Sequence, residues 1–140
     1  MSTAQVGSPS LTAELVWAGD LKFGATSGVT AIVLDGDSVA GPSPMQALAE
    51  ALAGCMAIDI VTILQKGRHA LRGLHVTFSG ERAAEPPKRL LTAHLRFHVT
   101  GDVPPAAVER AIELSRRTYC SVWHSLRPDL EITTAYEIHG

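Results

Sequence analysis

Apolar and polar side chains alternate over two long stretches of the chain, and alternation with a period of two predicts β-strands. Residues 91–100 form the longer stretch, with an inward-facing set of Leu91, Ala93, Leu95, Phe97 and Val99. The outward-facing set of the same stretch is Thr92, His94, Arg96 and His98. The last strand is predicted over 132–138, with one face made of Ile132, Thr134, Tyr136 and Ile138. Shorter runs predict strands over 12–17, 21–23, 31–34 and 74–79.

A helix start is predicted at Ser43, which follows a loop rich in Gly, Ser and Pro. Ser43 suits the N-cap, Pro44 suits the first helical position, and Gln46 completes a capping box. We expect this helix to run to about Lys66 and to end at Gly67.

A second helix is predicted after Pro104-Pro105, followed by a short helical piece over 121–126 that stops before Pro128. The apolar face of the helix that follows Pro104-Pro105 is expected to contain Val108, Ala111, Ile112, Ser115 and Tyr119. The charged segment 81–88 contains prolines and is predicted to be a loop. The resulting order is β-β-β-α-β-β-α-β, which is an α+β fold.

The central helix is apolar on nearly every side. One stripe contains Met45, Leu52, Met56 and Ile63, while Ile58, Ile60 and Val61 point in other directions. One small sheet covers a single face of a helix, so the remaining apolar faces need another cover. We therefore predict a homodimer with this helix near the subunit interface.

Composition places the chain among globular proteins. With 140 residues and 46% hydrophobic residues, it is expected to form a single domain over 1–140, preceded by a loose lead-in of residues 1–10. The net charge of −2 argues against nucleic acid and against an anionic membrane surface. No signal peptide and no apolar run of membrane-spanning length is recognised, so we expect a cytoplasmic protein.

The two cysteines, Cys55 and Cys120, are the main candidates for chemistry, because a reducing compartment disfavours a permanent structural disulfide. Cys55 shares a polar stripe of the central helix with Asp59, and its simplest alternative role is packing, with Asp59 bonded to a backbone group. Cys120 is expected at the border of the apolar face, where Arg116 is placed to lower its pKa.

Metal and nucleotide sites have weaker support. Cys120 and His124 are one helical turn apart, but no matched second pair of ligands accompanies them. His94 and His98 lie about 13 Å apart along a strand and are expected to be solvated side chains. No phosphate-binding loop is present, so we predict neither a metal nor an organic cofactor.

Two segments resemble the OsmC/Ohr family. The sequence GPSPM of residues 41–45, followed by AGCMAIDIV of residues 53–61, is similar to the first-cysteine helix of these proteins. The sequence LSRRTYCSV of residues 114–122 is similar to their second-cysteine motif. The stretch TILQKGR of residues 62–68 and the Glu81-Arg82 loop resemble the YhfA-like branch.

The resemblance implies an OsmC-like fold and an intertwined homodimer with central cysteine-bearing helices. It also implies a peroxidase of the oxidative stress response that reduces small organic hydroperoxides. Cys55 would then be the peroxidatic thiol and Cys120 the resolving thiol. A sulfenic acid on Cys55 would condense with Cys120 to a disulfide, which a dithiol reductant would reopen.

The resemblance is incomplete at the residues that activate the thiolate. The peroxidase branches carry a Glu where this chain has Met45, and an Arg in the early strands, whereas the first arginine here is Arg68. Lys22 or an arginine of a partner subunit is a possible replacement. The alternative hypothesis is a non-peroxidase protein that binds a small apolar or thiol ligand at the dimer cleft, with redox-sensing or vestigial cysteines.

Overall fold

A computed structural model of the chain describes residues 10–140. The chain divides into two compact units, one ending at Leu48 and one beginning at Ala49. The predicted lead-in of residues 1–10 lies outside the described residues except for Ser10. The single domain over 1–140 stays a prediction.

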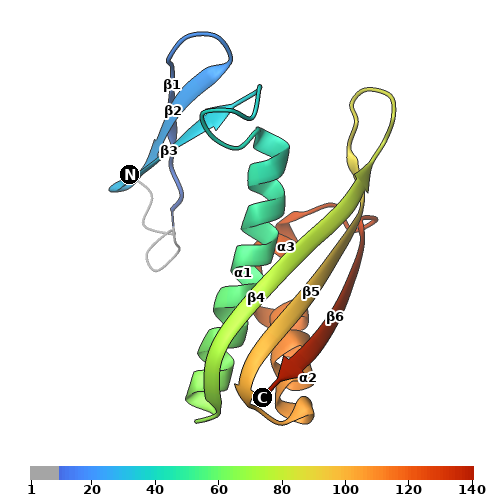
Figure 1. The fold of residues 1–140 in the computed structure, drawn as a ribbon. Coiled ribbons are helices and arrows are strands. Elements are labelled where there is room, and N and C mark those ends of the chain that lie inside the picture. The colour runs from blue at the N-terminus through green and yellow to red at the C-terminus, as the bar shows by residue number, and fades with distance from the viewer. Residues whose placement is uncertain (1–9) are drawn as a thin grey trace, which may run out of the picture. The chain divides into compact units, whose positions relative to one another are not determined.

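The first unit contains an antiparallel sheet of three strands, β1 (Glu14–Trp17), β2 (Lys22–Ser27) and β3 (Thr30–Asp35) (Figure 1). Strand β2 continues beyond the predicted 21–23, because residues 24–26 pair with both neighbouring strands and Ser27 pairs with Thr30 of β3. Several large apolar side chains of this sheet are exposed, namely Leu15, Val16, Trp17, Phe23, Ile32 and Val33.

Helix α1 (Pro44–Lys66) begins with the predicted capping box. The Ser43 backbone N–H donates to Gln46 Oε1 over 2.9 Å, and the Gln46 N–H donates to Ser43 Oγ over 3.2 Å. These reciprocal bonds satisfy two backbone donors that the first turn of a helix leaves free.

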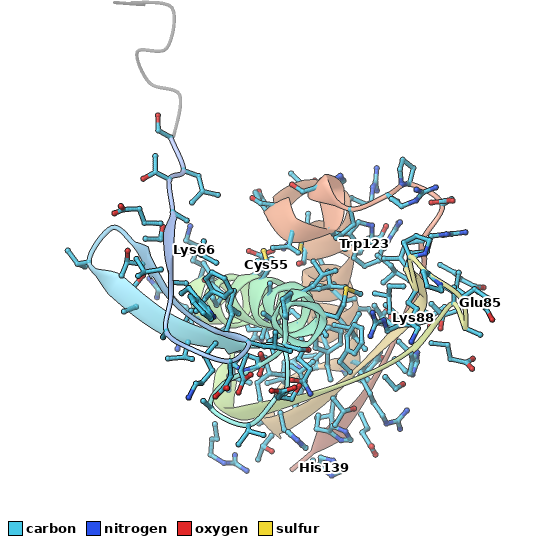
Figure 2. The ribbon with its side chains drawn as sticks, turned by 90° about the horizontal axis from the view of Figure 1, so that it is seen from above. Cys55, Lys66, Glu85, Lys88, Trp123 and His139 are labelled. Atoms are coloured by element: carbon cyan, nitrogen blue, oxygen red, sulfur yellow. The ribbon has the colours of Figure 1, made fainter. Side chains whose placement is uncertain are left out.

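The second unit has two layers. Strands β4 (Ala70–Arg82), β5 (Leu90–Asp102) and β6 (Glu131–His139) form one sheet in that order, antiparallel between β4 and β5 and parallel between β5 and β6. Helix α2 (Pro105–Leu114) and the α1 residues of this unit lie on one face of the sheet (Figures 1 and 2). A π-helical turn, η1 (Ser115–Tyr119), and the short helix α3 (Ser121–Ser125) connect α2 to β6.

The core lies between the sheet and the helices. Every second residue of β5 from Ala93 to Val99 is fully buried, which confirms the predicted alternation, although Leu91 at the strand end is 37% exposed. The buried face of α1 advances by four residues at a time, through Leu52, Met56, Ile60 and Leu64. Burying each such side chain stabilises the fold by about 1.5–3 kcal/mol.

Strand β4 corrects the predicted boundaries. It begins four residues before Leu74 and continues to Arg82, so part of the segment 81–88 is strand. The extra length comes from pairing, since Ala70 meets Asp102 and Arg82 meets Leu90 across the ladder. A long β5 therefore imposes strand structure on a segment whose own composition favours a loop.

Helix α1 is long and apolar enough to cross a membrane by length and composition, contrary to the expectation that no apolar run reaches that length. Its buried side chains pack against β5 and α2, so α1 is a core helix.

Candidate functional site

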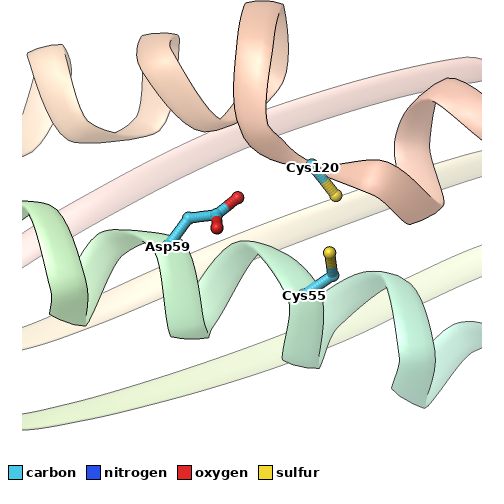
Figure 3. A group of neighbouring side chains, drawn as sticks. All are labelled: Cys55, Asp59 and Cys120. Atoms are coloured by element: carbon cyan, nitrogen blue, oxygen red, sulfur yellow. The ribbon is translucent and has the colours of Figure 1, made fainter. Parts of the chain in front are cut away.

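Cys55 lies on α1, on the side that faces the chain segment around Cys120 (Figure 3). Its side chain is half-buried, and Asp59 follows one helical turn later. The polar stripe predicted on this helix is therefore present, and it places the Cys55 thiol and the Asp59 carboxylate on the same side of α1.

Cys120 comes from the π-helical turn that ends α2. In this turn the Cys120 backbone N–H donates to the carbonyl of Ser115, five residues earlier, over 2.8 Å. The added residue brings Cys120 to the position that Tyr119 would hold in a continuous α-helix. Cys120 is consequently fully buried, although the sequence predicted it at the border of the apolar face. Tyr119 is 56% exposed, although the sequence predicted it on that face.

The side chains of Cys55, Asp59 and Cys120 converge. Their sulfur and carboxylate oxygen atoms all lie within 4.8 Å of one another, and the two sulfurs point toward each other (Figure 3). Both thiols are free. A disulfide requires a sulfur–sulfur distance of about 2.05 Å, so the two sulfurs would have to move closer to form one.

The buried environment keeps Cys120 protonated. Burial raises the pKa of the Cys120 thiol to about 11, and both the Cys55 side chain and the Asp59 charge act in the same direction. The backbone N–H of Trp123 donates to Cys120 Sγ over 3.3 Å and lowers the pKa, but burial outweighs it.

Arg116 does not have the predicted effect on Cys120. Its Nε donates to Glu113 Oε2 over 3.0 Å, so the guanidinium is paired on the exposed side of the turn. The pairing also lowers the pKa of the Glu113 carboxyl. The π-turn explains this correction, because it moves Cys120 away from Arg116 and into the core.

Asp59 has a side-chain partner that the sequence did not predict. The Ser115 hydroxyl donates to Asp59 Oδ2 over 2.8 Å, and Ser115 is fully buried. The available signal was a serine on the predicted apolar face of the second helix. The hydrogen bond satisfies a polar group at the boundary of the core, as buried hydroxyls require.

A cavity of about 460 Å³ adjoins Asp59. Its lining includes Thr62 and Lys66 from α1, Arg110 from α2, and Tyr119 from the π-turn. The cavity therefore combines polar and cationic side chains on one side of the thiol pair.

Other predicted candidates lie elsewhere. Nε2 of His124 lies 2.9 Å from the Arg116 carbonyl oxygen. The group of possible metal ligands that contains Cys120 is completed by Cys55 and Asp59 and does not include His124. Lys22 belongs to the first unit, where its ammonium lies 4.0 Å from Asp20. Trp123 packs partly buried against the core. By chemistry, Cys55, Asp59 and Cys120 are also a possible set of ligands for a thiophilic metal ion.

Comparison with known proteins identifies relatives over nearly the whole chain. A family model described as "OsmC-like protein" matches residues 35–135. Protein YhfA of Escherichia coli strain K12 is 40% identical over 131 residues, covering 91% of this chain and 98% of YhfA.

Solved structures of the same fold include a hypothetical protein from Aquifex aeolicus, with a TM-score of 0.87 and 24% identity, covering 94% of this chain and 97% of that chain. An organic hydroperoxide resistance protein OsmC from Legionella pneumophila superposes with a TM-score of 0.69 at 16% identity, covering 93% of this chain and 98% of that chain. At these identities the likeness establishes the fold.

Proposed function

Because the chain belongs to the OsmC-like family, we propose that its two cysteines reduce small organic hydroperoxides. The observation that carries the proposal is the convergence of Cys55 and Cys120 within 4.8 Å, with both thiols free. Two thiols at this separation are suited to a reversible cycle between dithiol and disulfide.

The proposed cycle begins at Cys55. Its thiolate attacks one oxygen of the hydroperoxide, so an S–O bond forms, the O–O bond breaks, and the leaving alkoxide takes a proton to become an alcohol. Cys120 then attacks the sulfur of the sulfenic acid and displaces hydroxide, which leaves as water with the thiol proton of Cys120. A dithiol reductant donates two electrons and two protons to restore both thiols.

The environments of the two sulfurs support this division of roles. Cys55 is half-buried and therefore open to a small substrate, whereas Cys120 is fully buried. Burial raises the pKa of Cys120 to about 11, so Cys120 stays a thiol until the sulfenic acid forms beside it. A protonated and buried thiol is a poor nucleophile toward the hydroperoxide, and its burial protects it until it attacks the sulfenic acid.

The residues around Cys55 predict a slow peroxidase. Met45 occupies the position of the activating Glu of the peroxidase branches, and no arginine precedes Arg68. Asp59 adds a negative charge beside Cys55 and Cys120. A cation from the second subunit of the proposed homodimer would offset this charge. We place the reaction in the cytoplasm, where both thiols are kept reduced.

Thiol counting by mass spectrometry tests the proposal. One equivalent of tert-butyl hydroperoxide is added to the reduced protein, to Cys55→Ser and to Cys120→Ser. We expect the unmodified protein to lose both thiols and to gain a Cys55–Cys120 disulfide. Cys120→Ser should stop at the sulfenic acid, and Cys55→Ser should not react. Thiols that persist for hours in the unmodified protein would exclude the peroxidase function.

The cavity beside Asp59 favours a second candidate function. Its volume of about 460 Å³ is within the range of small-molecule sites. As a non-peroxidase member of the OsmC-like family, the chain could therefore bind a small ligand next to the thiols. Persistent thiols, together with a thiol ligand that protects Cys55 from alkylation, would support this function instead.

A further inference from the structure

Three histidines from three different strands meet on the outer face of the β4–β5–β6 sheet, the face opposite the helices. His75 of β4 pairs in register with His98 of β5, and His98 pairs with Glu137 of β6. His139 lies two residues beyond Glu137 on the same strand face, and Figure 2 shows it on the side of the strands away from α1. Strand pairing therefore gathers imidazoles that are far apart in sequence.

Contacts within this group are close. His98 Nδ1 lies 3.1 Å from Glu137 Oε1, and His139 Nε2 lies 4.0 Å from Glu137 Oε2. The imidazole rings of His98 and His139 are stacked, with centroids 6.2 Å apart and planes inclined by 12°. One ligand atom from each of these three residues falls within 4.8 Å of the other two.

We propose that His98, Glu137 and His139 form a binding site for a zinc-like divalent transition-metal ion. Two imidazoles and one carboxylate are a ligand set that Zn²⁺ takes in proteins, with a water molecule in the fourth position. Zinc ligands at about 2.0–2.2 Å from the ion lie roughly 3.3 Å apart in a tetrahedron, so rotations of exposed side chains suffice to close the group. Magnesium and calcium prefer sets made of oxygen ligands alone.

Neighbouring side chains hold the three ligands in place. Arg96 Nε and Nη2 both lie 3.1 Å from Glu137 Oε1, which orients the carboxylate and leaves Oε2 directed to His139. His75 stacks on His98 with ring centroids 5.1 Å apart. Such outer contacts orient the ligands of a metal site and raise its affinity.

The site is open to solvent on its outer side. The side chain of His98 is 24% exposed, that of Glu137 40% and that of His139 55%, so an ion reaches them without opening the fold.

Zinc binding by calorimetry tests the site in the full chain carrying Cys55→Ser and Cys120→Ser, which removes the thiol ligands. We expect one Zn²⁺ per chain, with an affinity reduced at least about tenfold by His98→Ala or by His139→Gln. His94→Ala is the matched control, because His94 lies on the same strand face but contacts Thr133 at 2.7 Å, and it should leave the affinity unchanged.

A second measurement is independent of affinity. In nuclear magnetic resonance spectra, zinc should shift the imidazole signals of His98 and His139 while leaving those of His69 and His94 in place. The proposed site would be overturned if the His98→Ala and His139→Gln variants bound zinc as tightly as the chain that keeps both histidines. A loss of affinity only in His94→Ala would overturn it as well. Because both cysteines are replaced, this result is separate from the fate of the peroxidase proposal.

Discussion

The Ser115 hydroxyl donates a 2.8 Å hydrogen bond to the carboxylate of Asp59, although the two lie 56 positions apart in sequence. Ser115 opens the π-turn that delivers Cys120, and Asp59 follows Cys55 by one turn on α1. The bond therefore ties together the two segments that carry the thiols. It also fixes a carboxylate next to both sulfurs, and its charge contributes to raising the pKa of the Cys120 thiol.

Replacing Asp59 by Asn is predicted to lower the pKa of Cys120, because the Asp59 charge contributes to raising it. Asparagine keeps an oxygen that accepts the Ser115 hydroxyl, so the helix contact is retained. We expect alkylation of Cys120 by iodoacetamide at pH 8 to accelerate at least about twofold, measured by site-resolved mass spectrometry. Ser115→Ala is the control, since it removes the hydrogen bond but keeps the charge. Equal rates for Asp59→Asn and the unmodified protein would contradict the assigned role of the carboxylate.

The pH dependence of Cys120 alkylation gives a second prediction. Burial raises the pKa of this thiol from an ordinary value of 9.0 to about 11, so about one molecule in a thousand carries the thiolate at pH 8. We expect the alkylation rate of Cys120 to climb with pH until about 11, whereas the urea-unfolded chain should level off near 9. A folded-state plateau near 9 would show that burial does not control this thiol.

The same shift has a consequence for stability, because the folded state favours the protonated thiol. The raised pKa of Cys120 means that the protonated thiol contributes to the free energy of unfolding. This contribution is complete below about pH 9 and is lost as the pH rises through about 11. The midpoint of urea unfolding should therefore fall over this interval more in the unmodified protein than in Cys120→Ala.

Local signals in the sequence predicted most of the regular structure. The alternation of β5 and the capping box at Ser43 depend on neighbouring residues only, and the structure confirms both. The position of Cys120 depends on one residue inserted into the last turn of α2, and the segment SRRTY carries no glycine or proline to signal it. The π-turn buries Cys120 in the core and leaves Tyr119 exposed, an arrangement that involves contacts between segments distant in sequence.

Pairing between distant strands explains what else escaped prediction. The spacing of His94 and His98 on one strand predicted that they do not share an ion, and the group of possible ligands that contains His98 does not include His94. The partners of His98 come from β4 and β6, and their register is fixed only when the sheet assembles. A parallel β5–β6 pairing brings Glu137 beside His98 although 38 intervening residues separate them in sequence.

Exposed apolar side chains predict that two copies of the chain associate. Ile58 on α1 is 68% exposed in a single chain, and the β1–β3 sheet exposes large apolar side chains as well. Surfaces of this kind mark protein interfaces. We expect sedimentation equilibrium to show a homodimer, and we expect Ile58→Lys to raise its dissociation constant at least about tenfold, equivalent to about 1.4 kcal/mol.

Thr77→Lys is a matched control for this prediction, because it introduces the same charge on the outer face of β4, where Thr77 is exposed and pairs with Arg96. It should leave the dissociation constant unchanged, since that face is polar and lies opposite the helices. If the unmodified protein sediments as a stable monomer at micromolar concentration, the dimer is wrong, and the apolar face of α1 requires another cover. If Thr77→Lys weakens the dimer as much as Ile58→Lys does, added charge and not the loss of an apolar contact is responsible.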